Sequence, residues 1–352
     1  MSQYIKTLEK TYKSFRDVKY ILYEVKDSPY LVISFAAYFP VKASYSYLTA
    51  FEDLHCNRLY ILDNFGFENK GCWYLCENLN FDVEYSIIDL ITHIQRICGV
   101  SNENVITIGS SKGGWCALYY ALKYHFGYVV VGAPQIYLGS YLNDGIENKR
   151  NILIGMVGEI TIEKVNMLDN LIQKCIVPNK NIHIYFHHGL GDWHLIFHFK
   201  KFLESASKYI PNIFSDIKLY QGHEQLMNYF PDFLHEKIKT IIEGNSKELM
   251  KKKVNYLDRI NVLLDEIASK TILSIVGSLR IRVTIPIHLD NSQFAISLVD
   301  SNNKLIYESM FQKETIFEIN GIDNTIVKEI KIILRNSIGE IFTKTKSIDW
   351  QT

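Results

Sequence analysis

Ser111 lies in a short glycine-bearing turn whose residue types suit nucleophilic catalysis. The turn reads Gly109-Ser-Ser111-Lys-Gly113 and fits the pattern G-x-S-x-G, with a strand-like apolar run before it and a helical pattern after it. A serine at the tip of such a sharp turn has a strained backbone, and glycine two residues away on each side avoids a Cβ clash. We therefore expect Ser111 to be a nucleophile. The alternative is a tight turn in which this serine caps the helix.

An acyl-serine mechanism also needs hydrogen-bond donors for the oxyanion that develops during the reaction. The amide of Lys112 starts the predicted helix and should point to where this charge forms. A second donor usually comes from the loop after an earlier strand, which here begins with the small residues Ala36 and Ala37. Simple close packing is the alternative explanation for these two alanines.

A serine nucleophile works with an acid and a histidine, which in this arrangement follow it in that order along the chain. Asp192 lies in the glycine-bearing loop after one predicted strand, and His223 lies in the loop after the next. We expect Asp192 to orient the imidazole of His223, which would accept the proton of Ser111. The alternative for Asp192 is a turn and helix-cap residue, a role that can coexist with catalysis.

The segment from His187 to His198 is dense in potential metal ligands. His194 and His198 are four residues apart and could share a helix face, with Asp192 nearby, as in a catalytic zinc site. The serine turn would then have no role. We therefore expect no metal, and we expect these histidines to line the cleft or to support Asp192.

Strands and helices alternate from about residue 18 to residue 240, and these elements must position the candidate residues. Nearly continuous apolar runs predict strands that are buried on both faces, and longer amphipathic runs predict helices. The predicted strands are 20–25, 30–35, 58–63, 73–76, 104–109, 128–132, 181–188 and 216–220, and the predicted helices are 83–98, 113–124, 162–175, 193–209 and 233–242. This alternation predicts an α/β fold, with the α/β-hydrolase-like, doubly wound and mostly parallel sheet that the serine turn requires.

The C-terminal part of the chain has a different pattern. Polar residues at 244–253 lead into an apolar repeat over 254–268, which predicts a connecting helix, with a dimerising helix as the alternative. Short alternating strands separated by turn residues then predict a small β-sandwich. We therefore predict a catalytic domain at 1–243, a linker helix at 244–270 and a small all-β domain at 271–352.

Composition and the lack of targeting segments argue against several classes of protein and partner. The chain has 352 residues, and its 38 basic and 38 acidic side chains balance, so there is no electrostatic reason to expect nucleic-acid binding. The six cysteines do not form a disulfide pattern and indicate a reducing compartment. The N-terminal residues do not resemble a secretory signal, and no apolar run approaches the roughly 20 residues that span a bilayer. We expect a cytoplasmic protein without a transmembrane segment.

The run Ser111-Lys-Gly113-Gly114, with Asp192 about eighty residues later and His223 about thirty beyond that, resembles a known family. It is similar to the α/β-hydrolase-type O-acetyltransferases of bacterial capsular polysaccharides and to the acetyltransferases of accessory secretion systems. The early segment 58–66, followed by 71–75, is similar in character to that family, and the resemblance covers roughly residues 20–240. It implies that Ser111 takes an acetyl group from acetyl-CoA and passes it to a sugar hydroxyl, with His223 as base and Asp192 as its acid.

The resemblance also implies a substrate and partners. Acetyl-CoA would be a donor substrate, with no bound cofactor, and a polysaccharide would be the acceptor. Trp73 and Trp193 could stack on its sugar rings, with packing in the core as the alternative for each. The Lys112 side chain would either attract an anionic polymer or the phosphates of CoA, or face solvent. The C-terminal β domain departs from the compact capsule enzymes, which leaves glycan binding, homo-oligomerisation and docking to a capsule-synthesis complex open. A serine carbohydrate esterase or deacetylase with the same three residues is the main alternative, because it too proceeds through an acyl-serine.

Overall fold

The computed structural model describes residues 7–244, 256–277, 280–287, 289, 292–335 and 340–348. The chain divides into two compact units. The first contains Met1–His187, His198–Ser215 and Met227–Lys253, and the second contains His188–Phe197, Asp216–Leu226 and Val254–Thr352. The predicted limit at residue 243 lies ten residues before the division between Lys253 and Val254, and the limit at residue 270 matches none of these divisions. The three predicted domains stay a prediction.

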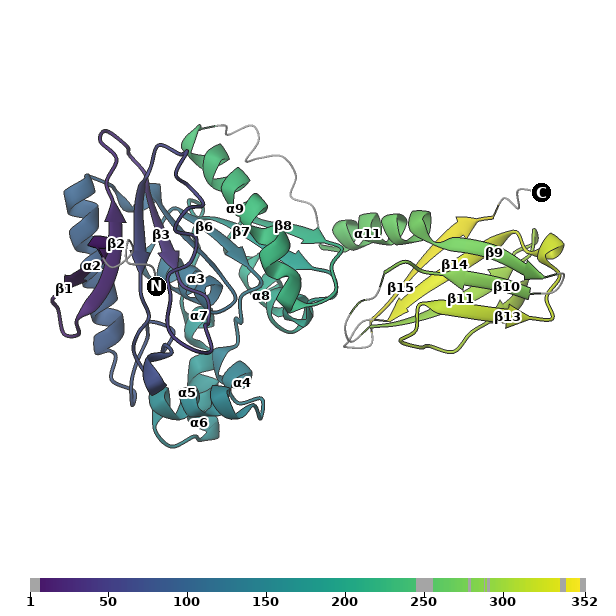
Figure 1. The fold of residues 1–352 in the computed structure, drawn as a ribbon, viewed down its shortest axis with the longest axis horizontal. Helices are drawn as coiled ribbons and strands as arrows, with labels where there is room; N and C mark the ends of the chain where they lie inside the picture. Colours follow the sequence, from purple (N-terminus) through teal and green to yellow (C-terminus); the bar gives the residue numbers. More distant parts are fainter. Residues whose placement is uncertain are drawn as a thin grey trace. The chain divides into compact units, whose positions relative to one another are not determined.

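An eight-stranded sheet forms the α/β part of the chain, with the order β1-β2-β4-β3-β5-β6-β7-β8 (Figure 1). Its first strands pair antiparallel, and β4, β3, β5, β6 and β7 run parallel. The Ile184 amide donates to the Asn212 carbonyl (2.9 Å), and the Leu190 amide donates to the Lys218 carbonyl (2.8 Å). Both partners move to higher residue numbers together, so β8 is parallel to β7. The strands are β1 (Lys10–Tyr12), β2 (Val18–Tyr23), β3 (Leu31–Phe35), β4 (Asn57–Ile61), β5 (Val105–Ser110), β6 (Tyr128–Gly132), β7 (His183–Gly189) and β8 (Ile213–Lys218). The predicted mostly parallel sheet is confirmed.

The central strands are continuous apolar runs because helices cover the sheet. Every residue of β3 and β5 is buried, and α3 packs against β3, β5 and β6. The helices of this part are α2 (Asp82–Cys98), α3 (Lys112–Tyr124), α4 (Leu138–Leu142), α5 (Glu147–Val157), α6 (Ile162–Asp169), α7 (Leu171–Lys174), the π-helix η3 (Leu195–Lys200), α8 (Lys201–Ala206) and α9 (Leu226–Ile242). The parallel strands therefore end at one edge of the sheet, where the loops that follow them carry the candidate residues.

Several predicted elements differ in the structure. The helix predicted at 233–242 begins seven residues earlier, at Leu226. The predicted strand at 73–76 is a turn, because Trp73 and Tyr74 have φ of 56° and 51° and the Asp63 carboxylate binds the backbone amide of Tyr74. The predicted helix at 162–175 is interrupted at Asn170, where ψ is −2°. The predicted helix at 193–209 begins as a π-helix, a wider turn that periodicity does not distinguish from an α-helix.

The C-terminal residues form two antiparallel sheets, as the predicted β-sandwich requires. Their orders are β13-β10-β9 and β12-β11-β14-β15. Apolar side chains alternate along β10 and β14, and those at the buried positions form a core. The strands are β9 (Ile272–Gly277), β10 (Arg280–Thr284), β11 (Gln293–Val299), β12 (Leu305–Glu308), β13 (Ile316–Asn320), β14 (Glu329–Arg335) and β15 (Ile341–Ser347).

The predicted linker helix is present as α11 (Tyr256–Lys270), and it packs against β15 of this β region. Its buried side chains include Ile260, Leu264 and Ile267, and the Lys346 ammonium donates to the Thr271 carbonyl at 2.7 Å. Residues 245–255 of the predicted linker, which include the polar stretch and the start of the apolar repeat, lie outside the described residues. These contacts support the connecting helix more than the dimerising one.

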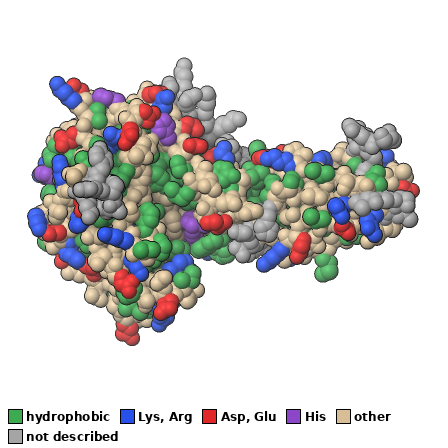
Figure 2. All heavy atoms as spheres, viewed as in Figure 1, with side chains coloured by type: hydrophobic (Ala, Val, Ile, Leu, Met, Phe, Trp, Pro, Cys, Tyr) green, Lys and Arg blue, Asp and Glu red, His purple; other side chains and the backbone are tan. Residues whose placement is uncertain are grey.

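Acidic and basic side chains are interspersed over the face of the molecule shown in Figure 2, as the balanced composition leads one to expect. Among the described residues, none of the helices has both the length and the apolar character that crossing a membrane requires.

Candidate active site

Ser111 sits between β5 and α3 with φ 53° and ψ −117°, a conformation that side-chain-bearing residues rarely adopt. Its amide donates to the carbonyl of Gly132 in the neighbouring strand at 2.8 Å. A Cβ on Gly109 would lie 2.3 Å from the Gly113 carbonyl carbon, and a Cβ on Gly113 would lie 2.2 Å from the Phe35 carbonyl oxygen. Both glycines of the motif are therefore required by close backbone packing, and the helix-cap alternative is not supported, because the serine side chain makes no cap hydrogen bond.

The side-chain amide of Gln135 donates a hydrogen bond to the Oγ of Ser111. Gln135 follows β6 and is fully buried, so it reaches the nucleophile from the strand next to β5. We did not predict this contact from the sequence. The sequence feature that could have indicated it is the position of Gln135 just after a buried parallel strand, because active sites of such sheets lie at the carboxyl ends of the strands. The neighbouring Ser110 instead accepts from the Tyr47 hydroxyl at 2.7 Å.

The Lys112 side chain was expected either to face solvent or to attract an anionic polymer or the phosphates of CoA, and the structure shows that both expectations are wrong. The ammonium lies 2.7 Å from the Asp63 carboxylate, with 2% of the Lys112 side chain and none of the Asp63 side chain exposed. It therefore neither faces solvent nor reaches an anionic polymer or the phosphates of CoA. The lysine side chain runs inward because a carboxylate there can neutralise it, which the sequence spacing did not reveal. Its backbone amide belongs to the first turn of α3, whose amides have no acceptor within the helix.

The amides of Ala36 and Ala37, the other predicted oxyanion donors, follow β3 on the opposite side of β5 from β6. In this structure the Ala36 amide donates to the Tyr74 hydroxyl at 2.9 Å, and the Ala37 amide donates to the Ser46 hydroxyl at 3.1 Å. Both amides thus have an acceptor already. Either one would have to exchange that acceptor before it could bind an oxyanion, so their role stays a prediction.

Asp192 and His223 form a hydrogen-bonded pair in the loops after β7 and β8. The Asp192 Oδ2 lies 2.7 Å from the His223 Nδ1, and Asp192 is buried while 27% of the His223 side chain is exposed. When His223 carries its proton on Nδ1, it donates to the carboxylate, and Nε2 is then the unprotonated nitrogen that can act as a base. A buried acid that holds a partly exposed imidazole in this way is the orienting arrangement of an acid–histidine pair.

His194 joins this pair. Its amide donates to the Oδ1 of Asp192 at 2.9 Å, and its Nδ1 lies 2.7 Å from the Nδ1 of His223. Burial acts to raise the pKa of Asp192, but the hydrogen bonds from His194 and His223 outweigh it, and the pKa lies well below the ordinary 3.8. Asp192 is therefore an anion at neutral pH. The amide contact shows that Asp192 also has the turn role, alongside its contact with His223.

The zinc alternative required Asp192, His194 and His198. The structure gives a different group, because the His198 Nδ1 accepts from the Tyr137 amide at 3.2 Å. Among the described residues, the potential ligand atoms that gather are those of Asp192, His194 and His223, within 4.8 Å of one another. These three side chains also form the hydrogen-bonded acid and two imidazoles described above, and the absence of a metal stays a prediction.

The two tryptophans predicted to bind sugars have different surroundings. Trp73 is 2% exposed, so it offers no face to a sugar ring in this structure. Trp193 is partly exposed, and its ring centroid lies 4.1 Å from that of His194. Stacking of a substrate on Trp193 stays a prediction, and the same prediction for Trp73 is wrong because its ring belongs to the core.

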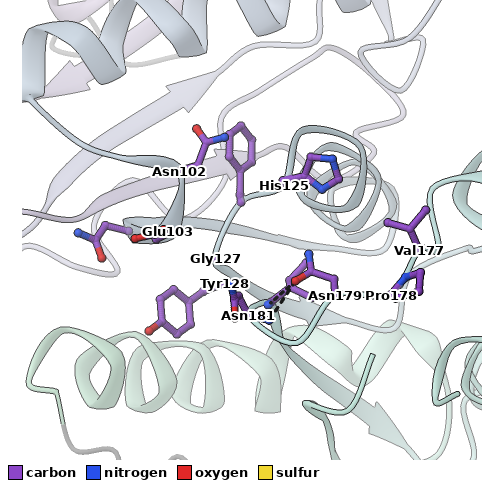
Figure 3. A pocket seen from close by; sticks show the side chains of 12 residues that line it. Asn102, Glu103, His125, Gly127, Tyr128, Val177, Pro178, Asn179 and Asn181 are labelled. Atoms are coloured by element: carbon purple, nitrogen blue, oxygen red, sulfur yellow. Dashed lines mark hydrogen bonds between the residues drawn. The ribbon is translucent and has the colours of Figure 1, made fainter. Parts of the chain in front are cut away.

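A pocket of about 660 Å³ lies at the amino ends of β5 and β6, the opposite end of these strands from Ser111 (Figure 3). Its asparagines serve local structure. The Asn102 Oδ1 accepts from the Gln95 side chain at 2.9 Å, and the Asn179 Oδ1 accepts from the Asn181 amide at 3.0 Å. This pocket lacks a nucleophile and an acid–histidine pair among the residues that line it, so it is not the candidate active site.

Comparison with known proteins gives similarity at the level of structure. No family model matches the sequence. No curated protein matches it either. Among solved structures, the capsule O-acetyltransferase of Neisseria meningitidis serogroup A superimposes with a TM-score of 0.54 and 19% identity, over 68% of this chain and 99% of that one. A mutant of that enzyme in complex with CoA gives a TM-score of 0.53 and 21% identity, over 66% and 94% of the two chains.

Two other kinds of protein share the arrangement. The Glycosylation Associate Protein complex of Streptococcus agalactiae gives a TM-score of 0.54 and 16% identity, over 66% of this chain and 46% of that one. An acylaminoacyl peptidase of Pyrococcus horikoshii gives a TM-score of 0.53 and 14% identity, over 72% of this chain and 43% of that one. The capsule enzyme and the glycosylation protein are of the kinds that the sequence resemblance indicated. At these identities the likeness concerns the fold, and the chain has the α/β-hydrolase-type fold that these proteins share.

Proposed function

We propose that this chain is a serine-dependent O-acetyltransferase that moves an acetyl group from acetyl-CoA to hydroxyls of a bacterial capsular or surface polysaccharide. The observation that carries the proposal is the strained serine turn, with the Ser111 amide held by Gly132, in a chain that also carries the buried Asp192–His223 pair. The serine and this pair follow β5, β7 and β8 of one sheet. Since the carboxyl ends of parallel strands meet at one edge, we assign them to one catalytic triad.

In the first half of the reaction, His223 accepts the hydroxyl proton of Ser111 as the Oγ attacks the thioester carbonyl. The Lys112 amide stabilises the oxyanion, with Ala36 or Ala37 as the second donor if it exchanges its present acceptor. The carbon–sulfur bond then breaks, and His223 returns the proton to the leaving thiolate. The products are acetyl-Ser111 and CoA, and Asp192 stabilises the imidazolium in between.

In the second half, a sugar hydroxyl attacks acetyl-Ser111 while His223 accepts its proton. Collapse of the second oxyanion breaks the ester bond to Oγ, and the same proton passes to the serine. The acetylated sugar leaves and the enzyme returns to its initial state. In this route acetyl-CoA is a substrate and no bound cofactor is required. The solved complex of a structurally similar capsule O-acetyltransferase mutant with CoA is consistent with this. We place the reaction in the cytoplasm, where acetyl-CoA is available.

Hydrolysis is the second candidate function, favoured by the acylaminoacyl peptidase among the similar folds. Water would replace the sugar hydroxyl in the second half of the reaction. The two functions thus differ in one reactant, and they share Ser111, Asp192 and His223.

The test measures CoA release from acetyl-CoA with and without a panel of bacterial capsular polysaccharides. Ser111→Ala should lower turnover by about 10⁴–10⁶-fold. Ser110→Ala is the matched control, since it removes the neighbouring hydroxyl, and it should retain most of the activity. Release that needs both a polymer and Ser111 supports the transferase. Cleavage of an aryl acetate that needs Ser111, without polymer-dependent release, supports the esterase. Activity that survives Ser111→Ala removes the proposal.

A further inference from the structure

Gln135 presents a complete amide to the nucleophile, but only half of that amide is bound. Its Nε2 donates to the Ser111 Oγ, whereas its Oε1 is buried and has no hydrogen-bond donor within reach among the described residues. Gln135 is fully buried, and a buried carbonyl without a donor is unfavourable. A glutamine with a purely structural role would be expected to use both ends. Because the Oε1 has no exposed surface in this structure, the missing donor indicates a ligand that reaches it in another state of the enzyme.

The loop that carries Gln135 is fixed on both sides. The Ala133 amide donates to the His187 carbonyl at 2.9 Å, and the Tyr137 amide donates to the His198 ring at 3.2 Å. Residues 133–136 are all buried. The side-chain amide is thus held in place next to Ser111, and it does not depend on a mobile loop to reach the reacting oxygen.

The contact also has a consequence for the serine hydroxyl. A hydroxyl has one proton and two acceptor lone pairs, and the Gln135 amide occupies one lone pair of the Ser111 Oγ. The serine proton must then point elsewhere, as transfer to a base requires. Once Oγ carries an acetyl group it becomes an ester oxygen, a weaker acceptor, and the Nε2 is released. The amide then offers one donor and one acceptor beside the acetyl-serine.

We propose that Gln135 binds the hydroxyl that accepts the acetyl group, with its Oε1 accepting from a sugar hydroxyl and its Nε2 donating to one. A carboxamide complements a hydroxyl, or two neighbouring hydroxyls of a sugar, because each side both donates and accepts. Gln135 approaches from β6, on the side of β5 away from Ala36. In the strand order, β7 and β8 lie beyond β6. The loops after those strands carry Asp192 and His223, and in the proposed mechanism His223 accepts the proton of the acceptor hydroxyl.

This inference rests on the proposed acetyl-serine and adds the specificity for a hydroxyl over water. In the transfer step, the bond from the acceptor oxygen to the acetyl carbon forms and the bond from Oγ breaks. The acceptor proton moves through His223 to Oγ. Gln135 exchanges no proton, and it orients the acceptor oxygen towards the carbonyl carbon.

The experiment uses the full chain and an aryl acetate as donor, with glycerol and methyl glucoside as hydroxyl probes. Intact-protein mass spectrometry follows acetyl-Ser111, and product analysis gives the ratio of acetyl transferred to a hydroxyl to acetyl released to water. Gln135→Met and Gln135→Glu should lower that ratio about tenfold or more, since each removes one or both complementary groups. Gln95→Met, which removes the same groups from α2, is the matched control and should leave the ratio unchanged.

The ratio distinguishes binding of the acceptor from a general defect. If both variants slow transfer and hydrolysis equally, Gln135 acts on Ser111 alone and the inference is overturned. If the native protein forms acetyl-Ser111 but neither probe increases its turnover, hydroxyl recognition is overturned and a serine hydrolase remains. If no acetyl-Ser111 forms, the proposed function fails together with the inference. Circular dichroism identifies a variant that fails to fold, and the two substitutions differ enough for one to serve in place of the other.

Discussion

Removing the charge of Asp63 should destabilise the protein strongly, because it would leave the Lys112 ammonium buried without a counterion. The pair is 2.7 Å apart and almost fully shielded from water. Breaking one partner of such a pair costs about 3–5 kcal/mol. For a domain of roughly this size each kcal/mol lowers Tm by about 2–4 °C, so Asp63→Asn should lower Tm by roughly 6–20 °C.

The coupling between the two residues tests the reason for this loss. Lys112→Met should restore part of the stability lost in Asp63→Asn, because the double variant has no unpaired charge. Urea unfolding of the native protein, both single variants and the double variant forms a double-mutant cycle, and we expect a coupling of about 2–3 kcal/mol. Full recovery is not expected, since Asp63 also accepts from the amides of Cys72 and Tyr74. Additive effects of the two substitutions, or a loss under about 1 kcal/mol in Asp63→Asn, would refute the reasoning.

Two further predictions concern packing and pH. Gly113→Ala should lower the free energy of unfolding by about 1–3 kcal/mol, because the added Cβ overpacks against the Phe35 carbonyl. Gly155→Ala in α5 is the control: its Cβ would have ordinary contact distances, so stability should be unchanged or rise by up to about 1 kcal/mol. Equal effects of the two substitutions in thermal melts would contradict this. The depressed pKa of Asp192 means that its stabilising contribution is present above the unfolded value of about 3.9 and is lost as the pH falls below it. Acid unfolding of Asp192→Asn should therefore show a weaker loss of stability at low pH than the native protein, and identical acid profiles would argue against the hydrogen-bonded anion.

The sequence was sufficient for the fold and the serine turn because both depend on local patterns. Buried parallel strands such as β5 and β6 are apolar runs of the right length, and the glycines at 109 and 113 mark a close backbone approach that the structure contains. The loops of Asp192 and His223 could be found because in this fold catalytic groups follow strands in a known order.

The sequence was insufficient where a residue's role depends on a partner far along the chain. Lys112 is an ordinary helix-start lysine by its neighbours, and only tertiary structure brings Asp63 to it. The contact of Gln135 with Ser111 likewise joins loops after two different strands. The turn at Trp73 was mistaken for a strand because an apolar run carries no sign of positive φ, which a fixed carboxylate at Asp63 helps to impose.

The backbone conformation of Ser111 has a consequence for engineering. A non-glycine residue at φ 53° and ψ −117° stores on the order of 1–3 kcal/mol of strain, which the rest of the fold must offset. Glycine at this position would relieve that strain and would also remove the hydroxyl. Selection of variants for heat tolerance alone would therefore favour loss of the nucleophile, so a directed-evolution scheme for this protein needs turnover and thermal survival in the same screen.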